Sequence, residues 1–196
     1  RVQTLAEIFR ANGYRTLAAI STQHLDPGQS GLGQGFGRLD APSDFKRSGD
    51  IASDRVKDWL DASEGVSTFA WVHVFDAHAP YDPPENLMER RSEGLQRESD
   101  TWDLEERFRP KWTRDEGLSS PEYINAMYAA EVDYVDRSLT ALLDMPRVRN
   151  GWTAFTADHG ESLTTHAIYW DHAGMSLPML TVPLILAGPG VAPARL

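Results

Sequence analysis

The sequence predicts an α/β fold, a layered and mostly parallel sheet flanked by helices. Segments with helical periodicity alternate along the chain with short apolar segments, an order typical of parallel strands that are joined by helices. The chain has 196 residues, of which 41% are hydrophobic, which is enough for one sizeable core. We therefore expect a single domain over residues 1–196.

The first half of the chain is expected to hold two helices and two strands. Apolar residues at helical spacing predict a short helix within 4–13, and a strand is predicted at 14–20. Five glycines, most of them among polar residues, make 28–37 a loop. A helix follows at 51–60, and the strand at 68–75 is apolar on both faces, as a strand buried between layers of helices would be.

The second half begins with a charged stretch. Residues 85–120 are expected to form a solvated surface excursion with one short helix around 102–108, and we assign it no chemistry. Ser120 before a proline predicts the start of a long helix that runs to about residue 144. Two further buried strands are predicted at 152–157 and 182–187.

Charge and composition exclude several classes of function. The formal net charge of -10 argues against nucleic acid as a partner. No stretch approaches the roughly 20 apolar residues of a membrane helix, and no signal peptide opens the chain. The absence of cysteine excludes disulfides, zinc-thiolate clusters and a thiol nucleophile within these residues.

Four of the six histidines lie in two short segments, each of which follows a predicted buried strand: His78, His159, His166 and His172. In α/β sheets, ligands bind beyond the carboxyl ends of the strands. We expect the strands at 68–75, 152–157 and 182–187 to lie parallel in one sheet and to bring His78 close to Asp158 and His159.

Asp158 and His159 precede Gly160 on a tight turn, where a carboxylate and an imidazole can bind one divalent cation. Two ligands alone bind a cation weakly. The alternative is that Asp158 caps a helix that starts near Glu161. His73 is expected to be a core residue, because it shares a strand face with Phe69, Trp71 and Phe75.

Six ordered matches, the first of which has two parts, carry a resemblance to a known family. The sequence resembles the sulfatases of the alkaline phosphatase superfamily, which hydrolyse sulfate esters and, in close relatives, phosphate esters and phosphonates. The matching stretches are TLAE and GYRT at 4–7 and 13–16, QGF at 34–36, HVFDAHAPY at 73–81, YAAEVDYVD at 128–136, TADHGESL at 156–163 and VPL at 182–184.

The resemblance implies a role for each candidate residue. Asp158 and His159 would bind a divalent cation, calcium or magnesium and in some members manganese. His78 would contact the anionic group of the ester. His172 would donate to the bound anion and protonate the leaving oxygen, with His166 as a further substrate-binding residue. The implied partner is a small molecule or glycan that carries a sulfate or phosphate ester, and the implied location is periplasmic or extracellular.

Two features of the family have no counterpart here. The leading strand with its pair of aspartate ligands is missing, and so is the Cys/Ser-x-Pro/Ala-x-Arg motif that yields the formylglycine nucleophile. We therefore expect an internal piece of a sulfatase-like protein, truncated at both ends and inactive alone. A phosphoryl or phosphoethanolamine transferase, a phosphonate monoester hydrolase and a non-catalytic remnant remain as alternatives.

Overall fold

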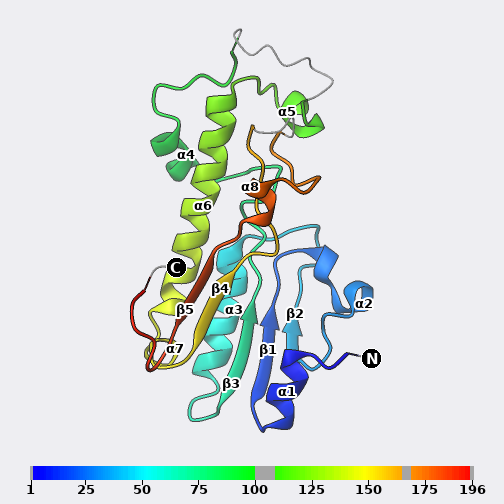
Figure 1. Cartoon of the computed structure of the whole chain (residues 1–196), viewed down its shortest axis with the longest axis vertical. Coiled ribbons are helices and arrows are strands. Elements are labelled where there is room, and N and C mark those ends of the chain that lie inside the picture. The colour runs from blue at the N-terminus through cyan, green and yellow to red at the C-terminus, as the bar shows by residue number, and fades with distance from the viewer. Residues whose placement is uncertain (1, 100–108, 165–168, 195–196) are drawn as a thin grey trace. The chain divides into compact units, whose positions relative to one another are not determined.

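The computed structural model describes residues 2–99, 109–164 and 169–194 (Figure 1). They form two compact units. The first consists of the chain up to Asp76 together with Val135–Leu143, and the second of Ala77–Tyr134 together with the chain from Asp144 onward. No helix among the described residues is long and apolar enough to cross a membrane.

The first unit holds a three-stranded parallel sheet, with β1 (Arg15–Ala19) between β2 (Arg38–Asp40) and β3 (Thr68–Val72). Leu17 of β1 is paired with Arg38 on one side and with Ala70 on the other. As the central strand, β1 is buried from its second residue onward. The predicted parallel sheet is confirmed here.

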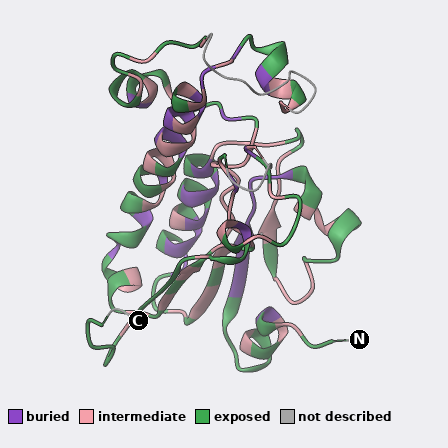
Figure 2. Ribbon diagram, turned by 45° about the horizontal axis from the view of Figure 1, so that its top comes forward, coloured by how far each residue is buried: buried purple, intermediate pink, exposed green. Residues whose placement is uncertain are grey.

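The two helices predicted in this unit are also confirmed. In α1 (Leu5–Ala11), the hydroxyl of Thr4 accepts from the Glu7 N–H while the Glu7 carboxylate accepts from the Thr4 N–H, which satisfies two free amides of the first turn. The helix α3 (Gly49–Asp61) buries one side. Figure 2 shows the buried residues of this unit gathered on β1 and on that side of α3. The expected loop contains the single turns η1 (Gln23–Leu25) and α2 (Pro27–Ser30).

The long helix α6 (Pro121–Leu143) begins in the second unit and ends in the first. The hydroxyl of Ser120 accepts from the Tyr123 N–H at 3.3 Å, as an N-cap residue should. A further turn, α7 (Pro146–Arg149), follows at once. The start and the end predicted for this helix are both confirmed.

Two expectations about strands are wrong in the second unit. β4 (Thr153–Thr156) and β5 (Leu184–Ala187) pair antiparallel in a sheet of their own, so the prediction of one parallel sheet that includes β3 is wrong. A parallel pair needs a crossover, usually a helix, and between β4 and β5 the described chain forms only the single turn α8 (Leu177–Leu180). β5 is also exposed along its length rather than buried, because an apolar run indicates a strand without fixing what covers it.

The charged stretch after residue 85 forms two short helices, α4 (Glu85–Arg91) and α5 (Lys111–Asp115). The helix expected around 102–108 lies outside the described residues. This stretch is mostly exposed, yet some of its side chains are buried. The core of the second unit is made of Tyr81, Leu118, Ile124, Met127 and Trp170.

Candidate functional site

His78 lies in the segment that opens the second unit. Its Nδ1 is 2.6 Å from the Ala79 carbonyl oxygen. A carbonyl can only accept, so Nδ1 carries the proton, and Nε2 carries the lone pair when the ring is neutral. The segment is anchored three residues on by Tyr81, which is 1% exposed. Ala77 has a φ of 73°, a left-handed conformation that is costly for alanine and typical of functional loops.

Asp158 and His159 occupy the turn after β4. The His159 N–H donates to Asp158 Oδ1 at 3.1 Å, and His159 Nδ1 is 2.9 Å from the Gly160 carbonyl oxygen. Nε2 of His159 therefore lies on the side of Asp158, 3.8 Å from Oδ2. Asp158 is the exposed member of the pair, with 86% of its side chain accessible.

Gly160 holds this turn against α8. Its N–H donates to the Met179 carbonyl at 2.8 Å, and a Cβ added at Gly160 would lie 2.0 Å from the Pro178 carbonyl oxygen. No side chain fits at that distance. The glycine thus fixes where the Asp158–His159 turn lies.

His172 is carried by a loop that pairs with the chain just after this turn. Ser162 and Asp171 form an antiparallel bridge, and Asp171 Oδ1 accepts from the N–H groups of His172 and Ala173 at 2.6 and 3.1 Å. Trp170 is buried, and its indole N–H donates to Asn125 Oδ1 at 2.8 Å. It has a φ of 48°, so a left-handed residue stands near this histidine too.

The three histidine rings meet. The centroids of His159 and His172 are 4.1 Å apart in a stacked arrangement, and those of His78 and His172 are 5.0 Å apart at 63°. His78 therefore lies close to the Asp158–His159 pair, as the sequence predicts. The sheet that was expected to bring these residues together is wrong, because β4 and β5 pair antiparallel in a sheet that does not include β3. His166 lies outside the described residues.

Two of the three histidines, His78 and His172, line a cleft of about 480 Å³ in the second unit. His78, Asp171 and His172 line it together with three residues of α5, which are Lys111, Trp112 and Asp115. No prediction from the sequence placed α5 in the site. The signal available was a tryptophan next to a Lys–Asp pair at i, i+4 spacing, within a stretch whose charge suggested only a solvated surface.

Glu161 is a second residue that no prediction from the sequence placed in the site. Burial, and next the nearby carboxylate of Asp171, raise the pKa of Glu161 to about 7, against an opposing effect of His159. Burial likewise raises the pKa of Tyr81 and of Tyr128, with Glu161 adding to both. These residues form one partly buried acidic and phenolic group close to His159. Residues 161–164 form no helix, so the alternative reading of Asp158 as a helix cap is wrong.

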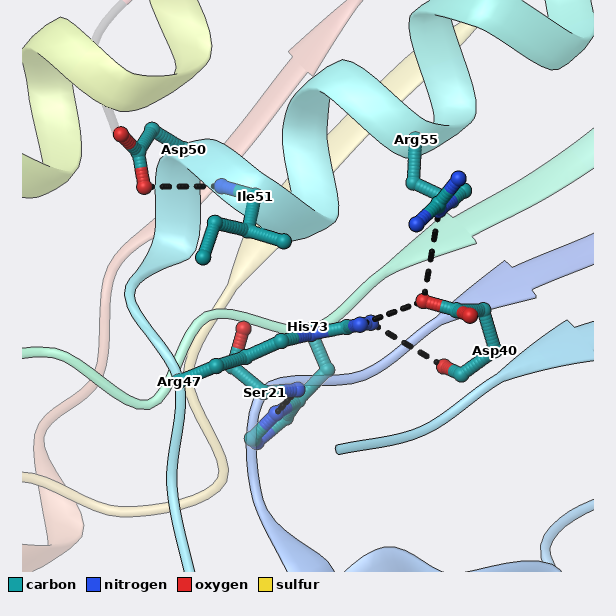
Figure 3. Close-up of polar contacts among 7 residues, drawn as sticks. All are labelled: Ser21, Asp40, Arg47, Asp50, Ile51, Arg55 and His73. Atoms are coloured by element: carbon teal, nitrogen blue, oxygen red, sulfur yellow. Dashed lines mark hydrogen bonds and ion pairs between the residues drawn. The ribbon is translucent and has the colours of Figure 1, made fainter. Parts of the chain in front are cut away.

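His73 belongs to the first unit, and its surroundings are drawn in Figure 3. Its Nδ1 accepts from the Ser21 N–H at 3.4 Å, and its ring lies 6.1 Å from Trp71 and 6.3 Å from Phe75. His73 packs against these rings as expected, but it is half-buried, so the expectation of a core residue is confirmed for its packing and not for its burial. In the same view, Asp40 pairs with Arg47 and, at 3.6 Å, with Arg55, which ties the end of β2 to α3.

The predicted cation ligands fit a metal in part. Asp158 Oδ2 and His159 Nε2, 3.8 Å apart, can both reach one cation at bond lengths of about 2.0–2.4 Å. Among the described residues, no group of three or more His, Asp or Glu is arranged to hold a cation. The pair fits as two donors to a metal and forms no complete site.

A family model described as Sulfatase matches residues 1–196. The chain belongs to the sulfatase family. A curated sulfatase family member from Bacteroides thetaiotaomicron, a Delta 4,5-hexuronate-2-O-sulfatase, is 39% identical over 74 residues, which is 38% of this chain and 15% of that protein.

Solved structures show the same fold at low identity. A protein in complex with its substrate D-glucosamine-2-N,6-O-disulfate has a TM-score of 0.66 at 18% identity, over 96% of this chain and 56% of its own. Phosphonate monoester hydrolase of Agrobacterium radiobacter has 0.65 at 18%, over 97% and 53%. The C-terminal periplasmic domain of EcEptC from Escherichia coli, in complex with Zn, has 0.62 at 16%, over 95% and 52%. The sulfatase chain thus spans about half the length of these structural relatives.

Proposed function

We propose that this chain is the part of a sulfate-ester hydrolase that binds the anionic group of the ester and protonates the leaving oxygen. The observation that carries the proposal is the meeting of His78, His159 and His172 beside Asp158, in a member of the sulfatase family. Cationic imidazoles are suited to bind a sulfate group, because a charged N–H donor forms a stronger hydrogen bond to an anion than a neutral donor does.

His172 is the proposed general acid. Its ring contacts those of both His78 and His159, and the backbone around it is fixed by Asp171. A positioned general acid contributes about 10²–10⁴-fold to a rate. His78 is the proposed binder of the anionic group, with its Nδ1 held by the Ala79 carbonyl and its ring next to that of His172.

Asp158 and His159 are the proposed donors to a divalent cation. When bound, such a cation polarises the oxygens of the ester and stabilises the charge that develops on them. An imidazole is a better donor to manganese or zinc than to calcium, which prefers oxygen ligands. The donor pair thus favours a transition metal over the calcium or magnesium implied by the family resemblance.

A sulfated sugar is the proposed substrate class. It is supported by the hexuronate sulfatase that resembles this chain over 74 residues and by the structural relative that binds a sulfated glucosamine. A periplasmic or extracellular location is proposed from the periplasmic domain among the relatives.

A phosphorus-centred reaction is the second candidate. Phosphonate monoester hydrolase and EcEptC match this chain over a similar share of their lengths, and the histidine cluster would bind a phosphonate or phosphate ester as well. The two candidates differ in the charge and geometry of the bound ester group rather than in the residues described here.

The test is equilibrium binding of inorganic sulfate and of phosphate to the 196-residue chain, with turnover of an aryl sulfate and an aryl phosphonate measured in parallel. We expect sulfate binding that weakens at least tenfold in His78→Gln and in His172→Gln. Met175→Ala, an exposed change in the same loop as His172, is the control. Equal sulfate binding by the unchanged chain, the two histidine variants and the control would contradict the proposal. Phosphate binding without sulfate binding would favour the second candidate.

A further inference from the structure

The cleft that contains His78 and His172 has a second wall, formed by α5. Lys111, Trp112 and Asp115 all line it. Its volume of about 480 Å³ lies within the range of sites that hold small molecules. A sulfate group bound at the histidines would leave room in this cleft for the rest of the ester.

Trp112 is fixed in place by the core of the second unit. Its ring meets that of Tyr81 edge to face, with centroids 5.1 Å apart and 70° between the planes. Tyr81 is itself buried and also meets Tyr128 at 5.6 Å. An indole that is held by a buried ring and still lines a cleft offers a rigid apolar surface. The C–H bonds of a sugar ring pack well on the electron-rich face of such an indole.

The charged groups of the wall favour hydroxyl groups over a second anion. The ammonium of Lys111 is paired with Asp115 one helical turn away, and the carboxylate of Asp171 lines the same cleft. Apart from the histidines, the described charged side chains that line the cleft are two carboxylates, those of Asp115 and Asp171, and one ammonium, that of Lys111. The Lys111–Asp115 pair offers both donors and acceptors to hydroxyl groups, whereas a carboxylate on the ligand would meet like charge.

We propose that α5 binds the sugar ring of the substrate, with Trp112 as the stacking surface, and that Asp115 and Asp171 select a ring that carries no carboxylate. The inference rests on the proposed function, in which the sulfate group is bound at His78 and His172. It makes Trp112 and Asp115 specificity-determining residues in a stretch that the sequence presents only as charged surface.

Two ligands that differ at a single carbon test the selection. Glucose 2-sulfate and glucuronic acid 2-sulfate share ring, sulfate position and hydroxyl pattern, and differ only in the hydroxymethyl or carboxylate at carbon 5. Calorimetry with the 196-residue chain is expected to show glucose 2-sulfate binding at least tenfold more tightly than either glucuronic acid 2-sulfate or inorganic sulfate.

Substitutions in α5 separate stacking from charge. Trp112→Ala should weaken glucose 2-sulfate about tenfold and inorganic sulfate less than twofold, and Trp112→Phe should restore most of the loss. Trp112→Leu keeps much of the core packing without an aromatic face, so it replaces the alanine variant if that one unfolds. Asp115→Asn should raise the affinity for glucuronic acid 2-sulfate severalfold. Arg114→Ala, exposed on the same helix, is the matched control.

The outcomes distinguish this inference from the proposed function. If inorganic sulfate binds through His172 but the Trp112 variants bind glucose 2-sulfate like the unchanged chain, the role of α5 is overturned and the proposed function stands. If glucuronic acid 2-sulfate binds more tightly than glucose 2-sulfate, the selection is overturned. If neither sugar sulfate nor inorganic sulfate binds, both proposals fail.

Discussion

The imidazole rings of His159 and His172 stack with their centroids 4.1 Å apart and 25° between their planes. One ring comes from the turn after β4 and the other from the loop that pairs with Ser162. His159 therefore has two separable properties. It can donate Nε2 to a cation beside Asp158, and it supports the ring of the proposed general acid.

Two substitutions at position 159 should separate these properties. His159→Phe keeps an aromatic ring under His172 and removes the nitrogen donor, so we expect sulfate binding within about twofold of the unchanged chain and loss of cation binding. His159→Ala removes both, and sulfate affinity should fall severalfold because His172 loses the ring that orients it. Calorimetric titrations with sulfate and with manganese measure both effects. Identical sulfate affinities for the Phe and Ala variants would show that the stacking is incidental.

Cation binding by this chain should be weak and should favour manganese. Two donors, Asp158 and His159, leave most coordination positions to water, so we expect a Kd of about 10⁻³ M or weaker. The imidazole donor favours manganese over calcium. Asp158→Ala should abolish the binding, and Asp54→Ala, an exposed acid of α3, should leave it unchanged. Micromolar calcium binding would mean that further ligands have been overlooked.

In the first unit, α1, α3, β1 and β3 were predictable because local signals agree with the packing, whereas β2 was not predicted. Glu7 three residues after Thr4 predicts the start of α1, and apolar spacing predicts α3. The direction of β5 was not predictable, because it depends on how the chain returns from β4 and not on the residues of either strand. Apolar composition alone does not distinguish a covered strand from an exposed one, and β5 is exposed.

The histidine cluster was predictable for a physical reason that the structure supports only in part. Polar residues that follow strands tend to converge, and His78, His159 and His172 do converge. Trp112 and Glu161 were not predictable as parts of the site. Their placement depends on tertiary contacts with Tyr81 and Tyr128, which no local pattern encodes.

Glu161 should make the chain less stable as the pH rises from about 4.5 to about 7. Its pKa is about 7 in the folded chain against a usual value of 4.5, so the folded state holds the proton over a range in which the unfolded state has lost it. Its stabilising contribution is complete below about pH 4.5 and is lost as the pH rises to about 7. Because the carboxyl is only half-buried, solvent reduces the effect, and we expect about 1 kcal/mol.

Denaturant unfolding in a metal-free buffer with chelator, at pH 5 and pH 8, measures this effect. Glu161→Gln should be about 1 kcal/mol more stable than the unchanged chain at pH 8 and should match it at pH 5. Glu85→Gln, an exposed change in α4, should follow the unchanged chain at both values. A stability gain from Glu161→Gln that is equally large at pH 5 and pH 8 would show that the carboxyl does not titrate in this range.

Gly160 should tolerate no side chain, and its replacement should damage both stability and the site. A Cβ there would lie 2.0 Å from the Pro178 carbonyl oxygen and 3.0 Å from that of Thr181, and both atoms belong to backbone that cannot turn aside. The turn must move away from α8, which breaks the Gly160 N–H bond to Met179 and shifts the preceding His159 off His172. We expect Gly160→Ala to cost about 1–3 kcal/mol of unfolding free energy and to weaken sulfate binding at least tenfold. In Gly28→Ala, by contrast, the added methyl meets only the Asp26 side chain, so unfolding and binding should both stay close to those of the unchanged chain. If Gly160→Ala unfolds at the same denaturant concentration as Gly28→Ala and binds sulfate as well, then the contact with α8 does not position His159.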